Sequence, residues 1–202
     1  MHESTWWILG PWSNFYVVIG SSAAALTGLM FVVLTLVAGV RSATTHTGLA
    51  AFTTPNVVHF CAALFLSALL VMPWRSLAPV AVLAGITSVY GIVYVGRVIL
   101  LTWRIESYDP DTEDWCWYAI LPMLAYLAVG AAAIFLTVIP RTALFVLAGA
   151  TLLLIFIGIR NAWDVVTWIT VRGSRNAETP SSSAASDESA ASDRSRPNPE
   201  QN

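Results

Sequence analysis

Polar side chains inside apolar runs are the residues of this sequence whose types and spacing suit chemistry. Arg160, Asn161 and Asp164 stand near the end of the last apolar run, and helical spacing places them on roughly a third of one helix circumference. A charge inside a bilayer costs roughly 3 kcal/mol or more. We therefore expect this stripe to face other helices or a water-filled cavity rather than lipid.

A second stripe is predicted where Tyr90, Tyr94 and Arg97 recur at helical spacing in another apolar run. Asp164 is expected to be held by an arginine, either Arg160 on its own helix or Arg97 from across the bundle. The two stripes and an isolated histidine make up one candidate inner polar cluster, whose members are His59, Tyr90, Tyr94, Arg97, Arg160, Asn161 and Asp164. Several helices must meet to bring these residues together.

The sequence lacks the patterns that hydrolytic and metal-dependent membrane enzymes need. It contains no HExxH, no GxSxG and no pair of carboxylates within a membrane run. His59 alone supplies too few ligands for a haem or a structural zinc, and Cys61 and Cys116 are too far apart for a CxxC pair. We expect a protein that is not an enzyme, with no catalytic residue, no cofactor and no metal.

The acidic segment 106–114 invites comparison with a calcium-binding loop. Its acids are Glu106, Asp109, Asp111, Glu113 and Asp114. An EF-hand loop needs a glycine at its sixth position and a bidentate acid at its twelfth, whereas this segment contains Pro110 and no such glycine. We interpret it as a solvated acidic loop.

The composition places the chain in a bilayer. Its 202 residues are 56% hydrophobic and 11% charged, with a mean hydropathy of +0.67, which lies outside the range of soluble domains. The formal net charge is −2, so the chain has no basic face to neutralise phosphates and no nucleic-acid partner is expected. The expected partners are the lipid bilayer and either a second copy or another membrane protein.

Apolar runs predict an all-α, polytopic membrane helix bundle with about five transmembrane helices. The runs cover residues 15–40, 55–71, 77–101, 122–139 and 143–171. Residues 1–14 contain Trp6, Trp7 and Trp12 and are expected to lie at the membrane interface. Residues 15–172 form the predicted transmembrane domain, and the Ser-rich residues 173–202 are expected to form a disordered tail.

The first run also carries a seam of small residues, which lets another helix approach closely. The candidate helix-packing seam consists of Gly20, Ala24, Gly28, Thr35 and Gly39. Packing within the chain and pairing with a second copy both fit this pattern.

The arginines predict the orientation, because short cytoplasmic loops are enriched in basic residues. With the N-terminus outside, the cytoplasmic side receives Arg41, Arg104, Arg172 and Arg175, and the outer side receives Arg75 and Arg141. We therefore expect a multi-pass protein of the plasma membrane with its N-terminus outside and its C-terminus in the cytoplasm. This topology gathers the ionisable groups of the helices near the inner leaflet, where arginines can also act as simple anchors.

The segment Ser22–Val32, SAAALTGLMFV, follows a tryptophan-rich N-terminus, and Asn161, Ala162 and Trp163 stand near the end of the last run. In these features, which cover about a quarter of the chain, the sequence resembles a group of small, uncharacterised, multi-span bacterial membrane proteins. Some of that group carry a label as modulators of a membrane-anchored AAA protease. The resemblance implies a helical membrane fold and supplies no catalytic residue.

The sequence leaves three functional hypotheses. The first is a non-enzymatic assembly or regulatory partner in a bacterial membrane, which uses the seam and the polar cluster. The second is a small homo-oligomeric channel or carrier for an anion or a proton, in which Tyr90, Tyr94, Arg97, Arg160 and Asp164 line an inner vestibule. The third is an intramembrane enzyme.

Overall fold

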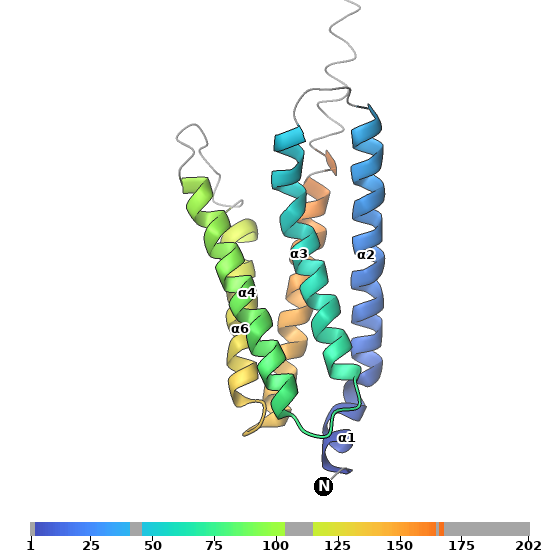
Figure 1. The fold of residues 1–202 in the computed structure, drawn as a ribbon, viewed down its shortest axis with the longest axis vertical. Helices are drawn as coiled ribbons and strands as arrows, with labels where there is room; N and C mark the ends of the chain where they lie inside the picture. The colour runs from blue at the N-terminus through green and yellow to red at the C-terminus, as the bar shows by residue number, and fades with distance from the viewer. Residues whose placement is uncertain (1–2, 41–45, 104–114, 165, 168–202) are drawn as a thin grey trace, which may run out of the picture. The chain divides into compact units, whose positions relative to one another are not determined.

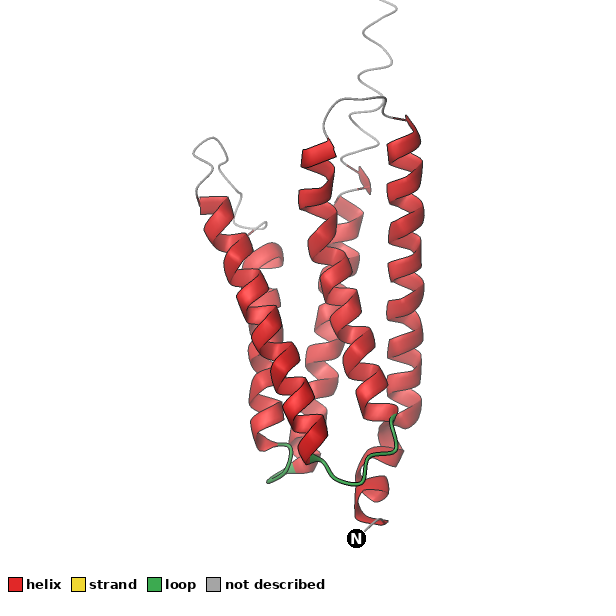
Figure 2. Cartoon of the chain, in the orientation of Figure 1, coloured by secondary structure: helices red, strands yellow, loops and turns green. Residues whose placement is uncertain are grey.

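The computed structural model describes residues 3–40, 46–103, 115–164 and 166–167. It divides into a unit of residues Met1–Trp163 and a second unit, Asp164–Asn202. The described ranges contain helices and turns and no strand (Figures 1 and 2). This confirms the predicted all-α class. The predicted acidic loop and the predicted disordered tail lie outside the described residues.

The helices follow the apolar runs, because a helix satisfies every backbone polar group within its own segment. In chain order they are α1 (Glu3–Leu9), the 3-10 turn η1 (Gly10–Trp12), α2 (Ser13–Val40), α3 (His46–Val71), α4 (Ala78–Trp103), the π-helical segment η2 (Cys116–Ile120), α6 (Leu121–Phe135) and a last helix, Pro140–Asp164.

Four stretches of the described chain are long and apolar enough to cross a membrane. They are Thr5–Val33, Ala78–Leu101, Cys116–Phe135 and Pro140–Asp164. Helix α3 adds a shorter apolar stretch, Asn56–Val71. The predicted all-helical bundle is confirmed, and four of its described helices, against about five expected, are long and apolar enough to cross a membrane.

Two predicted boundaries differ from the structure. Pro55 was expected to open the second membrane helix, but α3 begins at His46, so the proline stands inside the helix. Membrane helices tolerate an internal proline because neighbouring groups satisfy the freed carbonyl. The fourth helix was expected to run to Ile139, but α6 ends at Phe135 and a turn follows.

Within the first unit, the long helices pack around two core clusters. Helix α2 packs against α3, and α4 packs against α6. The last helix runs antiparallel to α3 (Figure 1), and its buried residues Leu144, Leu147 and Leu154 join core clusters that also contain residues of the other long helices.

One end of the bundle is built from the N-terminal segment and two connections. The Thr5 hydroxyl donates a hydrogen bond to the Arg75 carbonyl oxygen at 3.2 Å. The Trp12 ring packs edge-on against Phe145, with 4.7 Å between the ring centroids. The N-terminus and the α3–α4 connection therefore lie at the same end, as a topology with two spans between them requires.

Large apolar side chains also cover the outside of the first unit. Exposed examples from the long helices are Phe31, Phe65, Val89, Ile134 and Phe156. Water would disfavour so many exposed apolar groups on a soluble protein, whereas lipid solvates them. The surface therefore agrees with a membrane environment.

Candidate functional site

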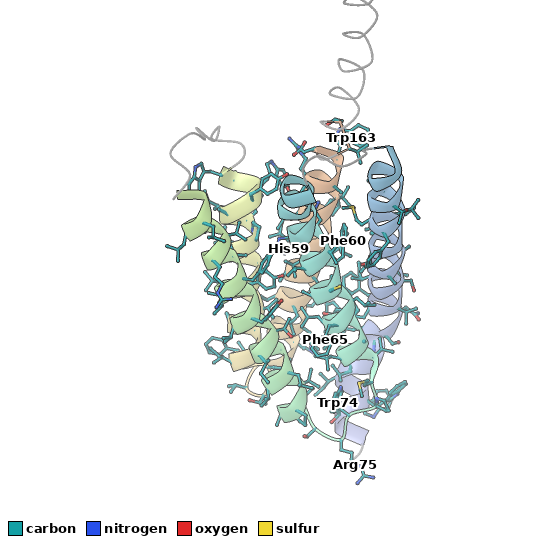
Figure 3. All side chains as sticks on the ribbon, turned by 45° about the horizontal axis from the view of Figure 1, so that its top comes forward. His59, Phe60, Phe65, Trp74, Arg75 and Trp163 are labelled. Carbon is teal, nitrogen blue, oxygen red and sulfur yellow. The ribbon has the colours of Figure 1, made fainter. Side chains whose placement is uncertain are left out.

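A hydrogen bond between a buried histidine and a buried tyrosine lies inside the first unit. His59 Nδ1 is 3.0 Å from the Tyr126 hydroxyl, which joins α3 to α6. Both residues are almost fully buried, at 2% and 0% exposure. Figure 3 shows His59 and Phe60 next to each other on α3, far from Trp74 and Arg75, which lie in the connection after that helix. The pair fixes the position of the imidazole ring in the bundle.

Small residues on α4 and α6 make room for this pair. Helix α4 passes so close to the Tyr126 ring that a Cβ atom at Gly91 would overlap it. The Ser88 hydroxyl donates a hydrogen bond to the Tyr126 carbonyl oxygen at 2.7 Å, and a Cβ atom at Gly130 would lie only 2.6 Å from that hydroxyl oxygen. A serine and two glycines therefore hold α4 and α6 together around the tyrosine.

Two buried asparagines lie near the same end of the bundle. Asn56 on α3 and Asn161 on the last helix are both fully buried. Neither carboxamide makes a hydrogen bond through its nitrogen or its oxygen within the described structure. A buried polar group without a partner costs about 1 to 3 kcal/mol, so these amides require an explanation.

The asparagines are placed by a close crossing of α3 and the last helix. A Cβ atom at Gly158 would overlap the Phe60 ring, so the two helices meet closely there. Asn56 precedes Phe60 by four residues on the same face, and Asn161 follows Gly158 by three. Because the helices run antiparallel, both amides lie about one turn beyond the crossing on the same side.

The expected inward stripe of α4 lies largely on the outside. Tyr90 is 61% exposed, Arg97 is also exposed, and Tyr94 is half-buried. The Tyr90 and Tyr94 rings stack with 6.4 Å between their centroids. The stripe was predicted to face inward because its residues are polar, but in the structure the inner face of α4 consists of small and β-branched residues, which are Val80, Ala84, Thr87, Ser88, Gly91 and Val95. Tyr90 and Arg97 therefore do not join His59.

The residues of the polar stripe on the last helix differ in how deeply they are buried. Asn161 is buried, whereas Arg160 is half-buried, with its guanidinium carbon 5.8 Å from the centroid of the Trp117 ring in η2. This is a cation–π contact. Asp164 is half-buried and begins the second unit. Its expected pairing with Arg97 or Arg160 stays a prediction.

The small-residue seam of α2 is divided between two faces. Gly20 is buried, and a Cβ atom there would lie 3.1 Å from Ser67 Cβ on α3. Ala24, Gly28 and Thr35 are exposed, and Gly28 has no neighbouring atom within 4 Å. Gly39 is part of α2, but its surroundings lie outside the described structure. The start of the seam serves packing within the chain, and the rest faces outward.

The sequence predicted His59 and Asn161 as members of the polar cluster, but it did not predict Tyr126 or Asn56 as members. A single tyrosine within the apolar run 121–135 was a usable signal, because a phenol hydroxyl in a membrane helix needs a partner. Asn56 stands next to Pro55, and this suggested a helix start rather than a buried position.

The buried residues offer neutral hydrogen-bonding groups. An imidazole, a phenol and two carboxamides supply both donors and acceptors. In the described part of the chain, no three residues among histidine, cysteine, aspartate and glutamate lie close enough to hold a metal ion. Cys61 is exposed, Cys116 is half-buried, and both are free thiols.

Comparison with known proteins gave no match to a family model, to a curated protein or to a solved structure.

Proposed function

We propose that this chain is an integral protein of a bacterial plasma membrane and serves as a non-enzymatic assembly or regulatory partner of another membrane protein chain. In this proposal the N-terminus lies outside and the C-terminus in the cytoplasm. The label of protease modulator in the group that the sequence resembles is compatible with such a role.

The outer face of α4 carries the proposal. Arg97 and Tyr90 lie seven residues apart, which is about two helical turns, within the apolar stretch Ala78–Leu101. Both are exposed on the first unit. A charge facing lipid is costly, so intramembrane arginines usually face protein or water. A second membrane chain covering this face would remove that cost.

Photo-crosslinking tests the proposal in cells. A photoreactive residue at Val93, which is exposed and one turn from Arg97, should give an adduct with another protein or with a second copy. The same residue at Val82, which is exposed and about two turns before Tyr90 towards the other end of α4, is the matched control and should give lipid adducts. Arg97→Ala should weaken the protein adduct. Lipid adducts at both positions would contradict the proposal.

The same face supports one alternative function. If several copies surround a common axis with α4 inward, Tyr90 and Arg97 would line a path for an anion or a proton. Reconstituted liposomes distinguish the two functions. A channel or carrier gives anion or proton flux that Arg97→Ala reduces, whereas an assembly partner gives adducts at Val93 and no flux.

A further inference from the structure

We propose that Asn56 and Asn161 form a binding site for one small, uncharged molecule that both donates and accepts hydrogen bonds. The site lies between α3 and the last helix, and it does not depend on the assembly role proposed above.

The geometry brings the two carboxamides to one level. Phe60 and Gly158 mark a close approach of their helices. Asn56 lies about 6 Å beyond this crossing along α3, and Asn161 lies about 4.5 Å beyond it along the last helix, given a rise of about 1.5 Å per residue. Both side chains follow the face that meets the other helix.

The hydrogen-bonding state of these groups points to a ligand. All four polar atoms of the two carboxamides are buried and without a partner in the described structure. Other buried polar groups on the same two helices are satisfied, since His59 bonds to Tyr126 and the Thr151 hydroxyl donates to the Leu147 carbonyl oxygen at 2.6 Å. The one further buried group without a partner in the described structure is the Tyr16 hydroxyl on α2. One small molecule bound between the two helices would therefore give hydrogen-bond partners to both amides.

The chemistry of the groups defines the guest. Each carboxamide offers an NH2 donor and a carbonyl acceptor, so a guest with both functions satisfies both sides. The two facing groups are neutral, and a charged guest buried there would lack a counter-charge. The guest is therefore a small amide, a urea-like molecule or, at the lower limit of size, water.

Burial also predicts how the guest exchanges. Neither asparagine is exposed, so a guest enters only when this end of the α3 crossing opens. Exchange of the guest should therefore be slow compared with exchange at the exposed Asn14 side chain.

Nuclear magnetic resonance of the full chain in nanodiscs tests the site, with water and acetamide as the probes. The side-chain NH2 signals of Asn56 and Asn161 should show cross peaks to water or move saturably with acetamide. Asn56→Leu should abolish the response at Asn161. Thr151→Val, which removes a satisfied buried hydroxyl from the same helix, should leave that response intact.

Each outcome decides the matter. Water cross peaks without an acetamide shift identify water as the guest, and a saturable acetamide shift identifies a larger polar guest. A direct cross peak between the two carboxamides, with no response to either probe, would overturn the proposal and show a simple amide pair. These signals come from the unaltered chain, so they remain decisive even where Asn56→Leu does not fold.

Discussion

Tyr126 has two roles at the scale of single residues. Its ring fills the space that Gly91 leaves open, and its hydroxyl satisfies the buried nitrogen of His59. Removal of the hydroxyl alone would keep the ring packing and leave the imidazole nitrogen without its partner. The energy of the hydrogen bond can therefore be separated from that of the packing.

Tyr126→Phe should lower the free energy of unfolding by about 1 to 2 kcal/mol, because it leaves a buried polar atom unsatisfied. Unfolding by a denaturing detergent measures this change. Tyr94→Phe is the matched control. That residue is half-buried and stacks on Tyr90 through its ring, so loss of its hydroxyl should have little effect. Equal losses in the two variants would show that the His59 bond contributes nothing specific.

Glycines show, at the scale of helices, where backbones approach each other. Gly158 lies against Phe60, whereas Gly149, about two and a half turns earlier on the same helix, has no atom within 4 Å of the position of a Cβ. The two positions have the same residue type and differ only in their surroundings.

Gly158→Ala should destabilise the fold by about 1 to 3 kcal/mol, because the added methyl group overlaps an aromatic ring in a packed core. Gly149→Ala should be neutral or slightly stabilising, since alanine favours the helix and meets open space. Detergent-induced unfolding of both variants gives the comparison. A stable Gly158→Ala protein would show that the α3 crossing is looser than described.

The seam of α2 allows a similar comparison. Gly20→Leu should disrupt the contact of α2 with Ser67 and reduce the folded yield. Gly28→Leu should leave the folded chain unchanged, because the position is open. If the outward part of the seam pairs with another chain, Gly28→Leu should lower the mass of the complex in detergent without lowering the melting temperature. Native mass spectrometry and thermal melting read these effects separately.

The sequence predicted the long apolar helices well because length and hydropathy determine them, although four rather than about five of the described helices are long enough to span a membrane. It predicted poorly which side of each helix is buried, and this has a physical reason. Lipid is as apolar as the protein interior, so hydrophobic periodicity does not mark the buried side of a membrane helix. Tyr90 and Arg97 were expected inside because they are polar, but both are exposed. The polar residues that are buried include Asn56 and Asn161, whose side chains are smaller and uncharged.

The topology can be tested for the whole molecule. The hydrogen bond between Thr5 and the Arg75 carbonyl places the N-terminus and the α3–α4 connection on one side of the bundle. The arginine distribution predicts that this side is the outside.

Reporter fusions after Arg75 and after Asn202 should therefore report opposite sides, with the fusion at Asn202 active in the cytoplasm. A cysteine at Ser76, which is exposed in the α3–α4 connection, should react with a membrane-impermeant reagent from outside, once Cys61 and Cys116 have been replaced by alanine. A cytoplasmic Ser76 would reverse the orientation and remove the expected inner-leaflet cluster.

The crossing of Phe60 and Gly158 also constrains the order of biosynthesis. Helices α2 and α3 can pair soon after they leave the ribosome, as can α4 and α6. The face of α3 that bears Asn56 and Phe60 is covered only after the last helix has been made. In the membrane protein proposed above, a chain that ends before Pro140 would keep the Asn56 carboxamide uncovered, and we expect the cell to degrade it faster than the full chain.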